Sequence, residues 1–375
     1  MGRDNDSESL PLCSDHDKMH HLQLACHSVV LALGLPLNAI ALWFFLRVVR
    51  LRTVVAVYMA NLAACDLFFT LALPLRLYYY ANHRWDLGNV PCQLAGSLFQ
   101  LNMYGSCLFL AAISVDRFLA LAHPLSSRAF RCPRVAWSVC GAVWALIVLG
   151  SVPVALAHDT SRCLLATNGS RVVEIRCFES FSGEAWKREL LPLVGLAETL
   201  GFLLPLSTVL VCSVKILAAL ARVDGRAERS GGRRRRRKTI FLLMVNALIF
   251  VACFVPYNVA LGVYALSRSD VAPLSTHSQK ELRLALQLTI LLSGTNCCLD
   301  PLVYYFSTEG FRTTLRAGTS AWSRGKSEPL KGKEERGRTQ WGARRARCGQ
   351  ERREVARMEL AQLTNDERVS PLTGV

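Results

Sequence analysis

Charged residues are scarce in this chain: they make up 19% of its 375 residues, whereas hydrophobic residues make up 51%. Ordinary water-soluble domains carry about a quarter charged residues, so this composition disfavours one. The chain also lacks a cleavable signal sequence, because residues 1–18 are polar and acidic rather than apolar. We therefore expect a membrane protein whose first apolar run acts as its own insertion signal.

Patterns that carry catalysis or nucleic-acid binding are missing as well. There is no His-Glu-x-x-His motif, no pair of catalytic carboxylates within one leaflet and no Ser-His couple in adjacent spans. The net charge is +16, but the basic residues cluster in short blocks between apolar runs and in the tail. That placement favours membrane topology over a nucleic-acid groove, and neither an enzyme, an organic cofactor nor a nucleic-acid partner is expected.

Seven apolar stretches are long enough to cross a bilayer, at about residues 23–47, 53–80, 92–122, 134–157, 189–221, 239–267 and 282–306. The predicted fold class is an all-α membrane protein, a seven-transmembrane helix bundle over residues 23–306. Residues 1–22 form its extracellular N-terminal segment. Residues 307–318 predict a short amphipathic helix on the inner leaflet, and the polar residues 319–375 predict a disordered cytoplasmic tail.

The orientation follows from the basic blocks. Arginines are concentrated at residues 47–52, 128–134 and 233–238, which are alternate links, whereas the N-terminus is acidic. By the positive-inside rule the N-terminus is outside and the tail is cytoplasmic, in a multi-pass protein of the plasma membrane. The sequons at Asn5 and Asn168 both fall on the predicted outside, where they are candidate glycosylation sites.

Four cysteines lie between the apolar runs, on the predicted outside, where thiols can be oxidised. Cys92 is expected to bridge to Cys177 or to Cys163, which would tie the loop after the fourth span to the top of the third. The remaining partner would then be Cys13. Spacing alone leaves this connectivity open.

Asp66 and Asp300 lie deep inside spans, where an ionisable group costs several kcal/mol unless it is paired or hydrated. Asp66 lies in the second span and Asp300 in the seventh. Together with Ser106 and Asn296 they supply enough oxygens for a small cation and its waters, so a structural sodium ion is the expected cofactor. The alternative is a hydrated polar network that only joins the helices.

The spans also carry one motif each, in an order that resembles class A, rhodopsin-like G-protein-coupled receptors. The resemblance covers roughly residues 23–316, and its motif residues are Asn38, Leu62, Asp66, Cys92, Asp116, Arg117, Phe118, Trp144, Pro205, Cys253, Phe254, Val255, Pro256, Asp300, Pro301, Leu302, Val303 and Tyr304. It implies that the partner is a heterotrimeric G protein; arrestin binding by the tail is left open.

The resemblance also implies how such a bundle switches. Asp116 would hold the guanidinium of Arg117 until the sixth helix moves outward about a hinge at Phe254 and Pro256, and Tyr304 would rotate inward. Phe118 and Phe254 replace a more usual tyrosine and tryptophan. The inner end of the sixth helix, residues 233–238, carries no acid to pair with Arg117. Weak restraint of the inactive state is therefore expected.

Basic residues at the outer ends of four helices predict an anionic ligand; they are Arg76, His158, Arg268 and Arg283. Below them, Tyr79, Phe99, Gln100 and Tyr257 would line a mostly apolar cleft, which suits an anionic head on a long apolar tail. The alternative is that these basic side chains only snorkel toward the lipid head groups and bind no ligand. Phe99 also stands where aminergic relatives place an aspartate, which disfavours an amine.

A closer resemblance is to the lysophosphatidic acid receptors of the purinergic-like branch. It is carried by short runs at residues 34–38, 57–62, 75–79, 102–107, 177–181 and 253–258. It implies lysophosphatidic acid or a related anionic lipid as ligand, bound through the four basic residues, and coupling to Gq and to the twelve/thirteen class. The alternatives are another anionic ligand, such as a nucleotide, fatty acid or peptide, or a cation transporter.

Overall fold

The computed structural model describes residues 17–123, 126–127, 131–157, 160–167, 170–177, 186–221 and 230–307. Within this part of the chain, seven helical segments are long and apolar enough to cross a membrane, which confirms the predicted fold class. They are Met19–Val49, Val54–Asn82, Asn89–Ala122, Pro133–Leu156, Leu191–Ala218, Leu243–Arg268 and Thr276–Val303. The predicted amphipathic helix, the tail and the sequon residues Asn5 and Asn168 lie outside the described residues.

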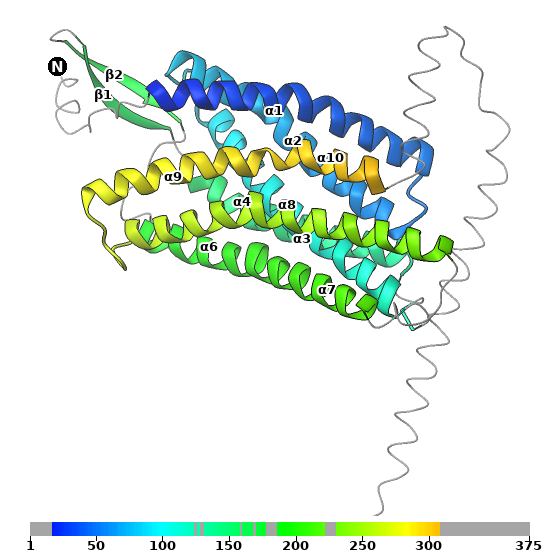
Figure 1. Ribbon diagram of the computed structural model, residues 1–375. Helices are drawn as coiled ribbons and strands as arrows, with labels where there is room; N and C mark the ends of the chain where they lie inside the picture. The colour runs from blue at the N-terminus through cyan, green and yellow to red at the C-terminus, as the bar shows by residue number, and fades with distance from the viewer. Residues whose placement is uncertain are drawn as a thin grey trace, which may run out of the picture.

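Figure 1 shows the spans running side by side as one bundle. The labelled helices are α1 (Asp17–Trp43), α2 (Val54–Asn82), α3 (Asn89–Ala122), α4 (Pro133–Ala157), α6 (Leu191–Leu196), α7 (Leu204–Ala221), α8 (Ser230–Arg268), α9 (Thr276–Gly294) and α10 (Asn296–Ser307). A π-helical segment, Ala197–Leu203, joins α6 to α7. The third span is central, because α3 packs against α2, α4, α7, α8 and α9.

Local signals mark where several helices begin and end. The side chain of Thr53 accepts a hydrogen bond from the Ala56 backbone N–H and caps α2, while Ser275 caps α9 in the same way. His83 ends α2 in the left-handed conformation, with φ at 59°. The seventh span is divided at Thr295 into α9 and α10.

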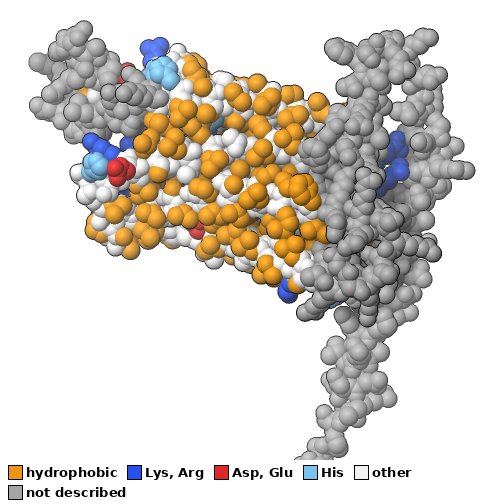
Figure 2. Space-filling view, viewed as in Figure 1, with side chains coloured by type: hydrophobic (Ala, Val, Ile, Leu, Met, Phe, Trp, Pro, Cys, Tyr) orange, Lys and Arg blue, Asp and Glu red, His pale blue; other side chains and the backbone are white. Residues whose placement is uncertain are grey.

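The outer surface of the bundle is apolar, as Figure 2 shows for one face. Leu149 on α4 leaves 72% of its surface exposed, and Leu156 is similarly exposed. Soluble proteins rarely expose so extended an apolar surface, whereas helices surrounded by lipid do. The exposed leucines therefore face the membrane.

Buried amides fasten the helices to each other inside the bundle. The side-chain amide of Asn38 donates to the carbonyl oxygens of Gly34 and Cys297 and so links α1 to α10. The indole N–H of Trp144 donates to the side-chain oxygen of Asn61 at 2.8 Å, which links α4 to α2. These bonds occupy polar groups that would otherwise be stranded in an apolar interior.

A two-stranded hairpin lies beyond the end of the bundle where α2 ends and α3 begins (Figure 1). Its strands are β1 (Ser161–Thr167) and β2 (Ser170–Arg176), paired antiparallel. Cys177, directly after β2, forms a disulfide with Cys92 in the first turn of α3. Of the two pairings that spacing left open for Cys92, the structure has Cys177. Cys163 is also disulfide-bonded, and its predicted partner Cys13 lies outside the described residues.

Candidate functional site

A cavity of about 270 Å³ lies in the half of the bundle nearest the hairpin. Five predicted ligand-binding residues line it together: Arg76, Phe99, Gln100, Tyr257 and Arg283. They come from α2, α3, α8 and α9, which the sequence separates by more than 200 positions from first to last. Most of the remaining lining is apolar and comes from α4, from α6 and from the π-helical segment that follows it. The cavity thus combines two cations with a long apolar wall.

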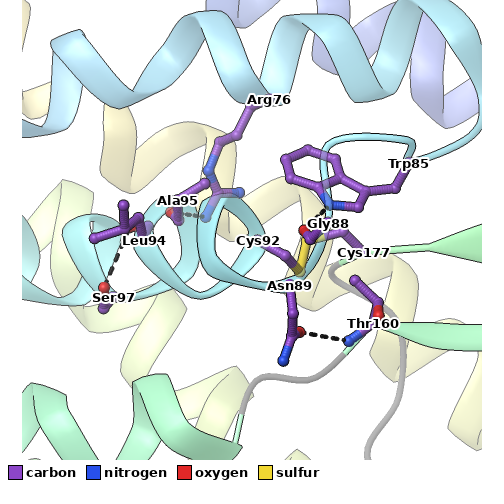
Figure 3. The surroundings of a disulfide bond; sticks show 10 residues. All are labelled: Arg76, Trp85, Gly88, Asn89, Cys92, Leu94, Ala95, Ser97, Thr160 and Cys177. Carbon is purple, nitrogen blue, oxygen red and sulfur yellow. Dashed lines mark hydrogen bonds between the residues drawn. A yellow bond between two sulfur atoms is a disulfide. The ribbon is translucent and has the colours of Figure 1, made fainter.

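Arg76 is held in place by α3. Its Nη2 donates to the carbonyl oxygen of Ala95 at 3.1 Å, and its guanidinium carbon lies 5.4 Å from the centre of the Phe99 ring. Figure 3 shows Arg76 reaching from α2 to α3 close to the Cys92–Cys177 disulfide. Because the disulfide and the Ala95 bond are only a turn of helix apart, the end of the hairpin and the buried cation are held by the same part of α3.

Aromatic rings form the floor beneath Arg76. The rings of Phe99 and Tyr257 meet edge to face with centroids 5.5 Å apart, and Phe69 packs against Phe99 from below in the same manner. Close packing continues on the opposite wall, where a Cβ on Gly201 would lie 2.6 Å from the Tyr104 ring. Glycine at this point lets the backbone approach Tyr104, and both residues line the cavity.

Two other predicted residues, Tyr79 and Arg268, are described by the structure but do not line the cavity. Tyr79 is buried in a cluster with Tyr80 and Trp85 and is not among the residues that line the cavity. Arg268, at the end of α8, does not line it either. His158 lies outside the described residues. Of the three predicted basic residues that the structure describes, Arg76 and Arg283 line the cavity and Arg268 does not.

Lys187 follows the cavity-lining Trp186 in the sequence and forms an ion pair with Asp270. Its ammonium lies 2.6 Å from the carboxylate of Asp270, in an exposed ion pair between the start of the fifth span and the loop after α8. The hydrogen bond and the charge of Lys187 hold the pKa of Asp270 below its ordinary value. This pair ties the π-helical segment Trp186–Leu190 to the turn after α8.

Sequence reasoning missed several lining residues, among them Trp186, Tyr264 and Gln287. Two carry a signal that could have been used: Tyr264 lies about two turns after Tyr257, and Gln287 about one turn after Arg283, so each shares a helix face with a predicted residue. Trp186 packs edge to face on Tyr264. It is the first residue of a five-residue π-helical segment, which is too short for periodicity to indicate which way a side chain points.

The predicted cation-site residues lie together in the middle of the bundle. Asp66 and Asp300 are completely buried and interact electrostatically. The amide of Asn102 donates to Asp66 at 2.8 Å and to Ser106 at 3.5 Å, and Asn296 donates to Asp300 at 2.8 Å. Asn102 is a member of this cluster that the sequence-based set omitted. One side-chain oxygen on each of Asp66, Asn296 and Asp300 has no hydrogen-bond partner in the described part of the chain.

The predicted switch residues at the other end of α3 are arranged differently from expectation. Asp116 does not bind Arg117: its carboxylate accepts hydrogen bonds from Arg131, which precedes α4, at 2.9 and 3.5 Å. The prediction that Asp116 holds the guanidinium of Arg117 is therefore wrong for this structure, in which Arg131 is the partner of Asp116. Phe118 lies 5.6 Å from the ammonium of Lys215 on α7.

The predicted hinge lies in the core of the bundle. Phe254 on α8 is buried and packs edge to face on Phe250 at 5.3 Å, two residues before the helix-interrupting Pro256. In the seventh span, Pro301 and Tyr304 both lie on α10. The side chain of Tyr304 lies outside the part of the structure that is described.

Comparison with known families decides which class of membrane protein this is. A sequence model described as "7 transmembrane receptor (rhodopsin family)" matches residues 37–304. The chain belongs to this family. It is a receptor rather than an enzyme, and its seven apolar spans make it a multi-pass protein of the plasma membrane.

Individual relatives of this rhodopsin-family receptor align over most of their length. Lysophosphatidic acid receptor 5 of Bos taurus is 55% identical over 84% of this chain and 84% of its own. The Mus musculus protein of the same name is 53% identical over 83% of this chain and 81% of its own. Lysophosphatidic acid receptor 4 of Homo sapiens is 36% identical over 80% of this chain and 78% of its own. As a rhodopsin-family receptor, the chain couples to heterotrimeric G proteins.

Proposed function

We propose that this receptor binds lysophosphatidic acid in the cavity described above and, when occupied, activates G proteins of the Gq and twelve/thirteen classes. The observation that carries the ligand assignment is the pairing of Arg76 and Arg283 with a long apolar wall in one cavity. Lysophosphatidic acid has a phosphate, a short glycerol link with one hydroxyl group, and a single acyl chain. The phosphate and the acyl chain each have a matching part of the cavity.

The phosphate would lie between the two arginines. A guanidinium can form two parallel hydrogen bonds to phosphate oxygens, and such charge-assisted bonds are roughly twice as strong as neutral ones. Arg76 keeps 6% of its surface exposed, so water screens its charge weakly. Its bond to Ala95 orients the guanidinium before the ligand arrives, which reduces the entropy lost on binding.

The acyl chain would extend along the apolar wall. This wall includes Ile147 and Val154 on α4, and Leu193 and Leu200 on the fifth span. Each methylene buried there contributes about 0.8 kcal/mol. Several methylenes therefore contribute as much as the head group, which accounts for a cavity whose lining is mostly hydrocarbon.

The names of the relatives support the same ligand. All of the most similar relatives given above are named lysophosphatidic acid receptors. A Homo sapiens receptor named for a uracil nucleotide and cysteinyl leukotriene is 35% identical over 76% of this chain. A nucleotide base would need several buried polar partners, whereas the wall next to the two arginines is mainly apolar.

We also propose that the central cluster holds a sodium ion. Three buried oxygens, one each from Asp66, Asn296 and Asp300, have no hydrogen-bond partner among the described residues. Oxygen ligands are those that a hard cation prefers, and two carboxylates this close are stabilised by a positive charge between them. The ion would hold the second and seventh spans together at their centre.

Displacement of bound, radiolabelled lysophosphatidic acid from membranes that contain the receptor tests the ligand assignment. The competitors are a lysophospholipid series, uridine and adenosine nucleotides, free fatty acids and short peptides. We expect lysophosphatidic acid to compete best and the monoacylglycerol of the same acyl chain to compete at least tenfold less well, because it lacks the phosphate. Stronger competition by a nucleotide or a peptide than by any lysophospholipid would show that the ligand class is wrong.

A further inference from the structure

The carboxylate of Asp116 is engaged by a residue outside its own helix. Arg131 Nε lies 2.9 Å from Asp116 Oδ1, and Arg131 Nη2 lies 3.5 Å from Oδ2. Asp116 is 4% exposed and the Arg131 side chain 29% exposed, so the contact is partly shielded from water. Two nitrogens facing two oxygens is the arrangement in which an arginine restrains a carboxylate most strongly.

Hydrogen bonds through Ser127 help to place Arg131 at this position. The hydroxyl of Ser127 donates to the carbonyl oxygens of Leu119 and His123 at the end of α3. The backbone N–H of Arg131 in turn donates to the carbonyl oxygen of Ser127 at 3.1 Å. Arg131 is thus tied, through Ser127, to the end of the helix that carries Asp116.

Arg117 is left without such a partner. Among the residues that the structure describes, Arg117 forms no hydrogen bond or ion pair, although the charge of Asp116 acts on it. The ionisable groups around Asp116 are Tyr58 on α2, Arg117 and Arg131. On the helix-six side, residues 233–238 are five arginines and a lysine, so no acid stands there to take over the restraint.

We propose that Arg131 keeps Arg117 available to the G protein by occupying the carboxylate that would otherwise hold it. Arg131 is in this sense a positioning residue, because it acts on G-protein coupling through Asp116. The receptor then activates nucleotide exchange without ligand, and Arg131 sets that basal level. This inference rests on the proposed G-protein function but is independent of which lipid occupies the cavity.

The test is basal nucleotide exchange by a G protein of the Gq class, with the purified receptor in lipid vesicles and no ligand added. We expect measurable basal exchange from the wild type and a fall of about two- to fivefold in Arg131→Gln, as for the loss of a partly exposed ion pair. Arg131→Lys retains the charge and should keep part of the basal rate. Arg134→Gln, three residues away, exposed and similarly charged, is the matched control and should leave the basal rate unchanged.

A mutant cycle separates this role from a purely structural one. In an Asp116→Asn receptor the carboxylate is gone, so Arg131→Gln should have no further effect on basal exchange. An equal fall in both backgrounds, an unchanged or raised basal rate in Arg131→Gln, or no basal exchange in the wild type would each overturn the proposal. A thermal melt of each variant identifies any that fail to fold. Stimulation by lysophosphatidic acid is measured in parallel, so loss of the ligand response alone would count against the proposed ligand and not against Arg131.

Discussion

Replacement of Arg76 by alanine should remove most of the receptor's preference for a lipid with a phosphate over the same lipid without one. Arg76 is buried and lines the cavity beside Phe99. Truncation of one partner in a buried, hydrogen-bonded charge pair costs about 2–5 kcal/mol, and 1.4 kcal/mol corresponds to a tenfold change in Kd. We therefore expect Arg76→Ala to weaken lysophosphatidic acid binding by roughly 30-fold or more. The lost bond to Ala95 should lower the free energy of unfolding by only about 1 kcal/mol.

Equilibrium binding of two ligands to each receptor separates the head-group effect from damage to the fold. The ligands are lysophosphatidic acid and the monoacylglycerol with the same acyl chain. In Arg76→Ala their affinities should converge, because only the first ligand loses a partner. Arg84→Ala is the control, since Arg84 is 64% exposed and pairs with Asp86 at the surface. If Arg76→Ala bound lysophosphatidic acid with wild-type affinity, or lost affinity for both ligands equally, the head-group site would be wrong.

Three further predictions concern the Cys92–Cys177 disulfide, the cavity wall at Gly201 and the buried cluster around Asp66. Cys92→Ser breaks the disulfide to Cys177 and should lower the free energy of unfolding by about 2–5 kcal/mol in a denaturation experiment. The control Cys26→Ser removes a free thiol and should not lower it, so equal stability of the two variants would contradict this. Gly201→Ala should cost about 1–3 kcal/mol in the same measurement, because its Cβ would press on the Tyr104 ring; no loss would mean that the ring moves freely. Sodium concentration should change ligand affinity in the wild type but not in Asp66→Asn, because the substitution removes a carboxylate that would hold the proposed ion; an equal sodium effect in both receptors would place the ion elsewhere.

The sequence alone predicted the bundle well, because length and apolarity decide whether a helix can cross a bilayer. The seven spans differ from the predicted ranges by a few residues at most ends, where apolar runs give way gradually to polar ones. The largest difference is in the seventh span, which begins at Thr276 rather than near residue 282. Polar residues such as Gln279 and Lys280 obscured that start, although Ser275 supplies a helix cap there.

The sites were only partly predictable, since they depend on contacts between distant residues. Arg76 and Arg283 could be placed at the outer ends of helices, yet periodicity does not show that Tyr79 turns away from the cavity toward Trp85. The pair between Asp116 and Arg131 was missed for a similar reason. The motif places an arginine next to Asp116, and only the folded turn around Ser127 reveals that a residue fifteen positions later reaches the carboxylate instead.

The most direct test of the account is nucleotide exchange on a purified G protein of the Gq or twelve/thirteen class, with the receptor reconstituted in vesicles. Lysophosphatidic acid is added at increasing concentration, and the monoacylglycerol of the same chain serves as the comparison. We predict saturable stimulation above the basal rate by lysophosphatidic acid and little by the uncharged lipid. Equal stimulation by both lipids, or none by lysophosphatidic acid at any concentration, would contradict the claim that the cavity binds the phosphate of the lipid and that this binding activates the G protein.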